Sequence, residues 1–251
     1  MATNCKNCNQ SIEGNFCSNC GQTTHTHEIN WHFLLHDIQH GFFHFDNGIF
    51  FTIKELFTRP GYTIKEFIEG KRVKHFKPIS FLIVLATLYG FLIHFLGIAE
   101  SNQITYDKAS KEVIQIKEIV EWFSVHYAFT SLILLPFYSL STYWAFKSEK
   151  YNFIQHVVLN AYLSGQHIIL RLLFIPVRLL FGKDASPQIF DIPDFISVAY
   201  TIWALWQFFD HLRYKKRFWK IVLSYVYLGI IFLLLLVLIV AAIGIFISKG
   251  K

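Results

Sequence analysis

The sequence predicts an all-α fold: a polytopic transmembrane bundle of about five helices, preceded by a small N-terminal zinc ribbon. Hydrophobic residues make up 53% of the 251 positions and charged residues only 16%, against roughly 45–50% and about 25% in soluble domains. Long apolar runs follow residue 78, and all four cysteines precede residue 21. This composition excludes intrinsic disorder, collagen-like repeats and a small disulfide scaffold.

Residues 1–24 are predicted to form the zinc ribbon. Two Cys-x2-Cys pairs lie eight residues apart, and the four candidate ligands are Cys5, Cys8, Cys17 and Cys20. Each pair places two thiolates on one tight turn, and two turns complete a tetrahedral shell suited to Zn²⁺. So short a module cannot bury a core, so the metal would supply the folding free energy. We expect a structural zinc, while a redox dithiol pair or an unmetallated tail stays open.

The composition of the ribbon also bears on its partner. It carries one cation, Lys6, and one anion, Glu13, so it lacks the basic stripe of nucleic-acid-binding modules. We therefore expect a cytoplasmic protein partner and no nucleic acid.

Residues 25–77 are predicted to form a cytoplasmic, amphipathic and interfacial helical region. Within it a histidine recurs every four residues, at His32, His36, His40 and His44. On a helix these rings share one face, where they could hold a second metal or titrate near neutral pH. The favoured interpretation is simpler: the row is the polar face of a helix that lies on the membrane surface.

A basic cluster stands at the end of this region, immediately before the first predicted span. Its members are Lys71, Arg72, Lys74 and Lys77. Cations at this position can contact anionic lipid headgroups. Plain positive-inside anchoring explains the same residues without a binding function.

The predicted bundle occupies residues 78–251. A bilayer core about 30 Å thick needs about 20 apolar residues in a helix. Five runs come close, and they cover residues 78–99, 122–146, 153–181, 193–209 and 219–247. With a cytoplasmic N-terminus, 15 Lys and Arg fall inside and 6 outside, as the positive-inside rule requires. We therefore expect a multi-pass protein with its C-terminus outside.

The third predicted span is unusually polar. Asn160, Ser164, His167 and Arg171 follow helical spacing and share one stripe, and Gln166 lies beside them. Polar groups at membrane depth are costly and face a bundle interior or a wet cavity. The stripe could line a substrate site, a conduit or a headgroup pocket, or it could serve as interhelical glue. We favour glue. No carboxylate is expected inside a span, which argues against a proton relay.

Several segments together resemble a family of bacterial membrane proteins grouped as domain of unknown function 3667. They are the cysteine module over Cys5–Gln22, TRPGYTIKEFIEGKR at Thr58–Arg72, KPISFL at Lys77–Leu82 and YNFIQHVVLNAYLSGQ at Tyr151–Gln166. The resemblance implies a multi-pass protein of the bacterial cytoplasmic (inner) membrane, and it implies no activity. Five spans behind a cytoplasmic segment are also distantly similar to Yip-type membrane organisers.

The chain is not expected to be an enzyme, because it lacks GxSxG, HExxH, Walker A and GxGxxG motifs. We expect a membrane adaptor or organiser whose ribbon binds a cytoplasmic protein while lipids surround the bundle. The alternative is a small-molecule or lipid transporter or channel lined by the polar stripe. Homo-oligomerisation stays open.

Overall fold

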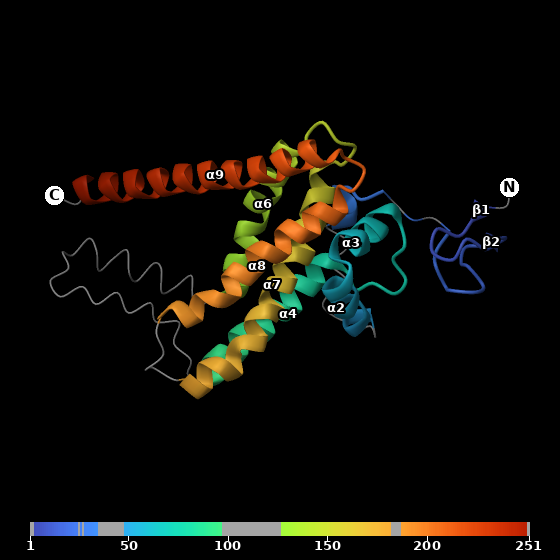
Figure 1. Ribbon diagram of the computed structural model, residues 1–251, viewed down its shortest axis with the longest axis horizontal. Coiled ribbons are helices and arrows are strands. Elements are labelled where there is room, and N and C mark those ends of the chain that lie inside the picture. Colours follow the sequence, from blue (N-terminus) through green and yellow to red (C-terminus); the bar gives the residue numbers. More distant parts are fainter. Residues whose placement is uncertain are drawn as a thin grey trace.

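The protein is predominantly helical in the computed structural model, which describes residues 3–24, 26, 28–34, 48–96, 127–181 and 187–249. A small strand pair lies near the N-terminus, and long helices form a bundle (Figure 1). The elements are β1 (Thr3–Asn4), β2 (Ser11–Ile12), α2 (Gly48–Thr58), α3 (Pro60–Glu69), α4 (Pro78–Phe95), α6 (Tyr127–Ala145), α7 (Phe153–Phe181), α8 (Pro187–Phe208) and α9 (Tyr214–Lys249).

Three of the described helices are long and apolar enough to cross a membrane, which indicates a membrane protein. They are Pro78–Phe95, Phe153–Phe181 and the stretch Tyr214–Ala241 of α9. α6 and α8 have comparable lengths of 19 and 22 residues.

The helix bounds agree with the sequence for α7 and differ for α8 and α9. α7 covers the predicted 153–181 in full. α4 and α6 lie within their predicted spans and end one residue before Leu96 and Phe146. Residues 97–99 and 122–126 of these spans lie outside the described residues. α8 begins at Pro187, where the sequence predicted residue 193, and α9 at Tyr214, where it predicted 219. Hydropathy locates apolar runs, whereas a helix can begin before its apolar run, as α9 does through Lys215, Lys216 and Arg217, residues of good helix propensity.

α7 is the central helix of the bundle, and its first half is buried on nearly all sides. α4 approaches it closely at Gly165, where an added β-carbon would lie 2.5 Å from the Phe81 ring. The hydroxyl of Tyr162 donates a hydrogen bond of 2.6 Å to the Phe76 carbonyl in the segment before α4. α7 therefore anchors both α4 and the chain that leads into it.

The connectors between the long helices meet the α2–α3 region at one end of the bundle. Lys65 on α3 forms an ion pair of 2.7 Å with Asp210 in the α8–α9 connector. In the α6–α7 connector, the Asn152 side-chain amide donates to the Ile29 carbonyl over 3.1 Å. On α8, the Tyr200 hydroxyl donates to a carbonyl of α2. These contacts place the N-terminal region and both connectors on the same side.

Candidate functional site

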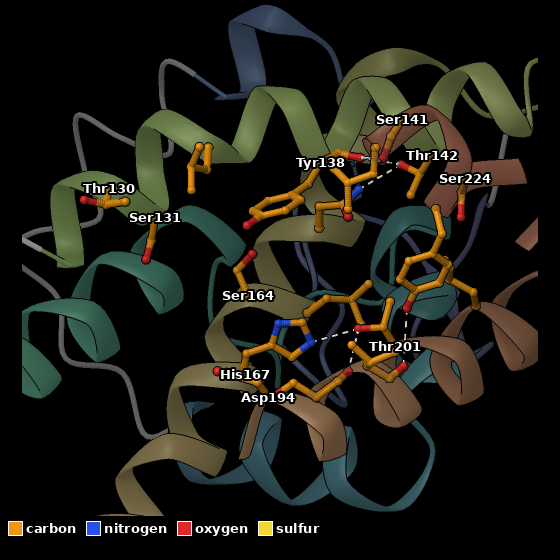
Figure 2. A pocket seen from close by; sticks show the side chains of 18 of the residues that line it. Thr130, Ser131, Tyr138, Ser141, Thr142, Ser164, His167, Asp194, Thr201 and Ser224 are labelled. Atoms are coloured by element: carbon orange, nitrogen blue, oxygen red, sulfur yellow. Dashed lines mark hydrogen bonds between the residues drawn. The ribbon is translucent and has the colours of Figure 1, made fainter. Parts of the chain in front are cut away.

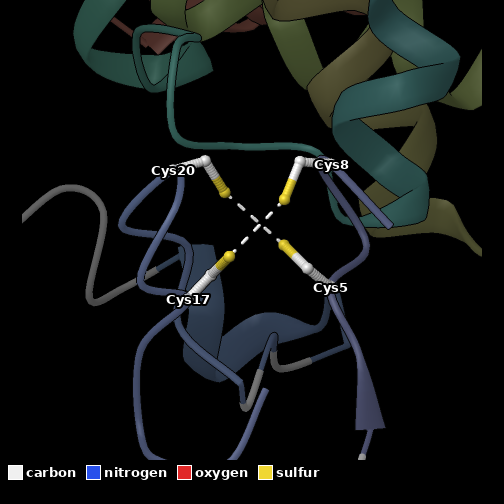
Figure 3. A group of neighbouring side chains, drawn as sticks. All are labelled: Cys5, Cys8, Cys17 and Cys20. Carbon is white, nitrogen blue, oxygen red and sulfur yellow. Dashed lines mark hydrogen bonds between the residues drawn. The ribbon is translucent and has the colours of Figure 1, made fainter. Parts of the chain in front are cut away.

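The four cysteines of the N-terminal module converge on one point (Figure 3). Their Sγ atoms all lie within 4.8 Å of one another. The Cys5–Cys20 and Cys8–Cys17 pairs are each separated by 3.5 Å, too far for a disulfide bond of about 2 Å. Four thiolates around a tetrahedral ion with metal–sulfur bonds of about 2.3 Å stand a little under 4 Å apart. The donor set therefore fits a metal ion.

Two equivalent turns build this cluster. In each, the N–H of the first cysteine donates to the carbonyl of a glutamine five residues later, over 2.8 Å: Cys5 to Gln10, and Cys17 to Gln22. The residue after the second cysteine donates back to the carbonyl of the first, also over 2.8 Å. The repeat CKNCNQ and CSNCGQ in the sequence encodes this symmetry.

The hydrogen bonds of these turns also tune the thiols. A backbone hydrogen bond at Gln10 lowers the pKa of Cys8 to about 6. In the other turn, desolvation and the contacts with Cys8 and Cys20 raise the pKa of Cys17 to about 11. The turns alone therefore do not hold all four thiols in the thiolate form that binds metal.

The ribbon docks on the segment that joins α3 to α4. The side-chain oxygen of Gln22 accepts hydrogen bonds from the N–H groups of Arg72 (3.2 Å) and Val73 (3.3 Å). Gly70 caps the end of α3 with a φ of 113° that suits glycine, and an added β-carbon there would lie 2.8 Å from the Lys6 side chain. The ribbon and the approach to α4 are thus in direct contact.

Of the histidine row, only His32 belongs to the described residues, and it is exposed in a short helical turn. His36, His40 and His44 lie outside the described residues. The proposed metal or pH-sensing role of this row stays a prediction.

The basic cluster before α4 makes several contacts within the protein. Lys71 pairs with Glu66 at 3.0 Å. The guanidinium of Arg72 lies over the Phe33 ring at 4.8 Å, and its burial lowers the pKa. Lys74 is exposed, and Lys77 is half-buried. Contact of these residues with lipid headgroups stays a prediction.

The polar stripe of α7 faces a cavity of about 410 Å³ between α6, α7, α8 and α9 (Figure 2). Four of the five predicted residues line it, namely Asn160, Ser164, His167 and Arg171. Gln166 does not. Both polar atoms of its buried side chain find no hydrogen-bond partner among the described residues. The structure thus joins the stripe into one cavity wall and separates Gln166 from it.

Hydrogen bonds to α6 and α8 hold the stripe in place. The Asn160 amide donates to the Thr142 hydroxyl on α6 over 2.9 Å. The Nε2 atom of His167 lies 2.8 Å from the Thr201 hydroxyl on α8. The stripe therefore makes the hydrogen bonds between helices that a packing role requires, and it also lines the cavity.

Arg171 forms an ion pair with Asp194 on α8. Its Nη2 atom donates to the Asp194 Oδ1 over 2.6 Å. The sequence counted Asp194 among the acidic residues of the outer connector. In the structure Asp194 belongs to α8, which begins at Pro187, and the expectation of no carboxylate at membrane depth stays a prediction.

Most of the remaining lining comes from α6 and α8 and was not identified from the sequence. α6 contributes Thr130, Ser131, Leu134, Tyr138, Ser141 and Thr142, and α8 adds Ser197, Val198, Thr201 and Leu205. These residues recur at intervals of three and four, which is the signature of one helix face. The sequence shows this spacing within each helix. It does not show that these faces of α6 and α8 lie opposite the polar stripe of α7.

Glu149, in the α6–α7 connector, contacts two lysines and a histidine outside the cavity. Its Oε1 atom lies 3.1 Å from Lys216 and 3.3 Å from Lys220, and its Oε2 accepts from His211 over 3.2 Å. Burial alone would raise the pKa of Glu149, but hydrogen bonds from these residues and from Ser148 lower it to about 2. Glu149 thus ties the start of α9 to the connector.

Comparison with known proteins gives one match. The family model described as Protein of unknown function (DUF3667) matches residues 46–90, the segment that holds α2, α3 and most of α4. Over these residues, about a fifth of the chain, the sequence is similar to that family, and the match includes the Thr58–Arg72 and Lys77–Leu82 segments that carried the resemblance. No curated protein and no solved structure matches the chain.

Proposed function

We propose that this chain is a five-span protein of the bacterial cytoplasmic membrane that binds and moves a small molecule or a lipid in the cavity between α6, α7, α8 and α9. One observation carries the proposal: a stripe that is costly to place in a membrane borders a volume of about 410 Å³. That volume falls within the range of ligand pockets in proteins, about 300–1,000 Å³.

The contacts between connectors support five spans. Three apolar helices satisfy the length and hydropathy of a span, and α6 and α8 lie between them in sequence. Glu149 before α7 contacts His211 before α9, and Lys65 on α3 contacts Asp210. The α6–α7 and α8–α9 connectors then lie on the same side of the membrane as the N-terminal region. This is the arrangement expected when all five long helices cross the membrane. That side is the cytoplasm, and the C-terminus lies outside.

The cysteine cluster would hold a structural Zn²⁺. Four thiolates form the closed donor set of structural sites and leave no open position for catalysis. The ion would supply the folding free energy that so short a module lacks. We assign no enzymatic role to it.

Transport is tested with purified protein in liposomes. Two probes are used, a fluorescent phospholipid whose leaflet is read by dithionite quenching and a self-quenched soluble dye. We expect flux of one probe, which His167→Ala and Arg171→Ala lower at least tenfold. Lys65→Gln, which breaks an ion pair away from the cavity, should leave flux unchanged. Flux no greater than that of empty liposomes would contradict transport.

A second candidate function is that of an adaptor whose ribbon binds a cytoplasmic protein. Its support is the exposed ring of Phe16, which is 64% accessible on the ribbon. Exposed aromatic residues are enriched in the contact surfaces of proteins. Cys17→Ser should then abolish capture of the partner and leave membrane insertion intact. Equal sets of captured proteins from both forms would contradict the adaptor.

A further inference from the structure

α2 has an inner face that is packed against the protein and an outer face that stays exposed. The buried residues of the inner face are Ile49, Thr52 and Leu56. On the outer face, Phe50 and Phe57 are 79% and 38% exposed, and the exposed Lys54 lies between them in sequence. Spacings of four and three residues bring these three side chains together on one side of the helix. Exposed aromatic rings beside a lysine are typical of a helix that lies at the boundary between lipid and water.

Two hydrogen bonds fix the position of α2 relative to the long helices. In the middle of α2, the Thr52 hydroxyl accepts from the N–H of Phe76 over 2.8 Å, two residues before α4 begins. One turn later, the Leu56 carbonyl accepts from the Tyr200 hydroxyl of α8 over 2.9 Å. α2 is therefore held between the segment that leads into α4 and the side of α8.

The depth of Tyr200 follows from contacts of α7, which runs in the same direction as α4 (Figure 1). The Tyr162 hydroxyl of α7 donates to the Phe76 carbonyl, so Tyr162 lies level with the start of α4. His167 lies five residues farther along α7, about 7.5 Å deeper, and it bonds to Thr201, the neighbour of Tyr200. The second half of α2 thus lies beside a part of α8 that is more than one helical turn below the start of α4.

This part of α8 presents apolar side chains outward. The ring of Tyr200 contacts the ring of Trp203, with 5.9 Å between centroids. Trp203 and its neighbour Ile202 are 39% and 41% exposed. Such a surface on a membrane-spanning helix is covered by lipid, and tryptophan is enriched where the lipid meets water. α2 therefore contacts the bundle at the level at which its apolar surface begins.

Two lysines lie beside the aromatic rings of α2. Lys54 belongs to the outer face, and the Nζ atom of the exposed Lys74 lies 5.9 Å from the centroid of the Phe51 ring. Within the described part of the chain, neither ammonium group pairs with a carboxylate. The long stem of a lysine lets its charge reach the headgroups while neighbouring rings lie deeper.

We propose that α2 is an in-plane anchor in the cytoplasmic leaflet. Phe50 and Phe57 lie among the lipid chains just below the headgroups, and the ammonium groups of Lys54 and Lys74 contact lipid phosphates. The partner of this face is the phospholipid surface itself. The proposal narrows the interfacial region expected over residues 25–77 to one helix and one face, and it does not depend on transport through the cavity.

Photocrosslinking tests the lipid contact on the full chain in liposomes of phosphatidylethanolamine and phosphatidylglycerol. The photoreactive residue p-benzoylphenylalanine replaces Phe50 on α2, Phe91 on α4 or Phe16 on the ribbon. The three rings are 79%, 62% and 64% exposed, so each site accepts the larger side chain. After irradiation, mass spectrometry of the intact chain measures the added mass. We expect phospholipid adducts at positions 50 and 91 in yields within twofold of each other, and a lipid yield at least tenfold lower at position 16.

A charge reversal tests the part assigned to the lysines. With the probe at position 50, Lys54→Glu combined with Lys74→Glu should lower the lipid yield at least threefold, because carboxylates repel the phosphates. Lys215→Glu is the control: Lys215 is also exposed, but it lies at the start of α9, and its reversal should leave the yield unchanged. An unchanged yield in the double variant would overturn the phosphate contacts.

The products at position 50 decide whether lipid is the partner. A chain that carries lipid at position 91 and none at position 50 would overturn the anchor, because the outer face would then meet water. A crosslink between two copies of the chain as the main product at position 50 would also overturn it, since the face would then be a protein interface.

Discussion

A β-carbon added at Gly61, in the first turn of α3, would overlap the carbonyl oxygen of Ala204 on α8. The Gly61 N–H also donates to the Gln207 side-chain oxygen over 3.1 Å. Two helices far apart in sequence thus touch through backbone atoms. This contact holds the α2–α3 region against the bundle.

Gly61→Ala should destabilise the protein because the backbone of α8 cannot yield as a flexible side chain would. Overpacking of a tight site costs about 1–3 kcal/mol, and we expect the upper part of that range. Thermal unfolding in detergent measures it. Gly90→Ala is the matched control, since no described atom lies within 4 Å of a β-carbon there. Equal unfolding temperatures for the two variants would contradict the close contact.

Glu149→Gln should loosen the start of α9. The neutral amide loses the attraction of Lys216, Lys220 and His211, and breaking such a partly buried cluster costs about 1–3 kcal/mol. Thermal unfolding at pH 7 checks the loss. Glu69→Gln is the control, because its pair with Lys150 is wider, at 3.8 Å, and more exposed. A loss of the same size in both variants would contradict a special role for Glu149.

The same carboxylate predicts a pH dependence. Its pKa is lowered from about 4.5 in the unfolded chain to about 2 in the folded protein. A lowered carboxyl pKa stabilises the fold fully above the unfolded value, and this stabilisation is lost as the pH falls toward the folded value. The difference in unfolding temperature between the unsubstituted protein and Glu149→Gln should therefore shrink between pH 5 and about pH 2. A constant difference would contradict the shift.

The sequence predicts what depends on one helix and fails where two helices must be paired. Asn160, Ser164, His167 and Arg171 follow from spacing alone, and the cavity contains all four. The partner of Arg171 could not be derived, because Asp194 lies on another helix. Hydropathy also placed the start of α8 at residue 193, since it does not register the helical turn that begins at Pro187.

Glu149 illustrates the same limit in a connector. It is one acidic residue between Lys147 and Lys150, a pattern typical of any solvent-exposed loop. Its role appears only when α9 brings Lys216 and Lys220 to it. The four cysteines, by contrast, were predictable because metal ligands on tight turns require fixed local spacing.

Gln22→Ala should free the approach to α4 from the ribbon. The amides of Arg72 and Val73 then lose their acceptor, and we expect their hydrogen exchange to accelerate about tenfold. Gln10→Ala is the matched control, because Gln10 holds the equivalent position in the other turn and its side chain is exposed. Unchanged exchange in Gln22→Ala would contradict the docking.

Metal removal should produce the same exchange signature without a substitution. If the ion supplies the folding free energy of the ribbon, chelation unfolds the turn that positions Gln22. Elemental analysis should find one zinc per chain before chelation, and Cys17→Ser should lose it. Protection of Arg72 and Val73 that survives complete removal of the metal would contradict this coupling.

Protease sites inserted after Lys147 and after Lys183 should distinguish five spans from three. With five crossings, the first site is cleaved only from the cytoplasm and the second only from outside. If α4, α7 and α9 alone crossed, the Lys147 site would lie outside and the Lys183 site in the cytoplasm. The N-terminus would still be cytoplasmic and the C-terminus outside, so tags on the termini cannot distinguish three spans from five. The three-span arrangement would also put Glu149 across the membrane from His211, although their side chains lie 3.2 Å apart. Cleavage of the Lys147 site from outside, in a variant that elutes as the unsubstituted protein does, would therefore contradict both the topology and this contact.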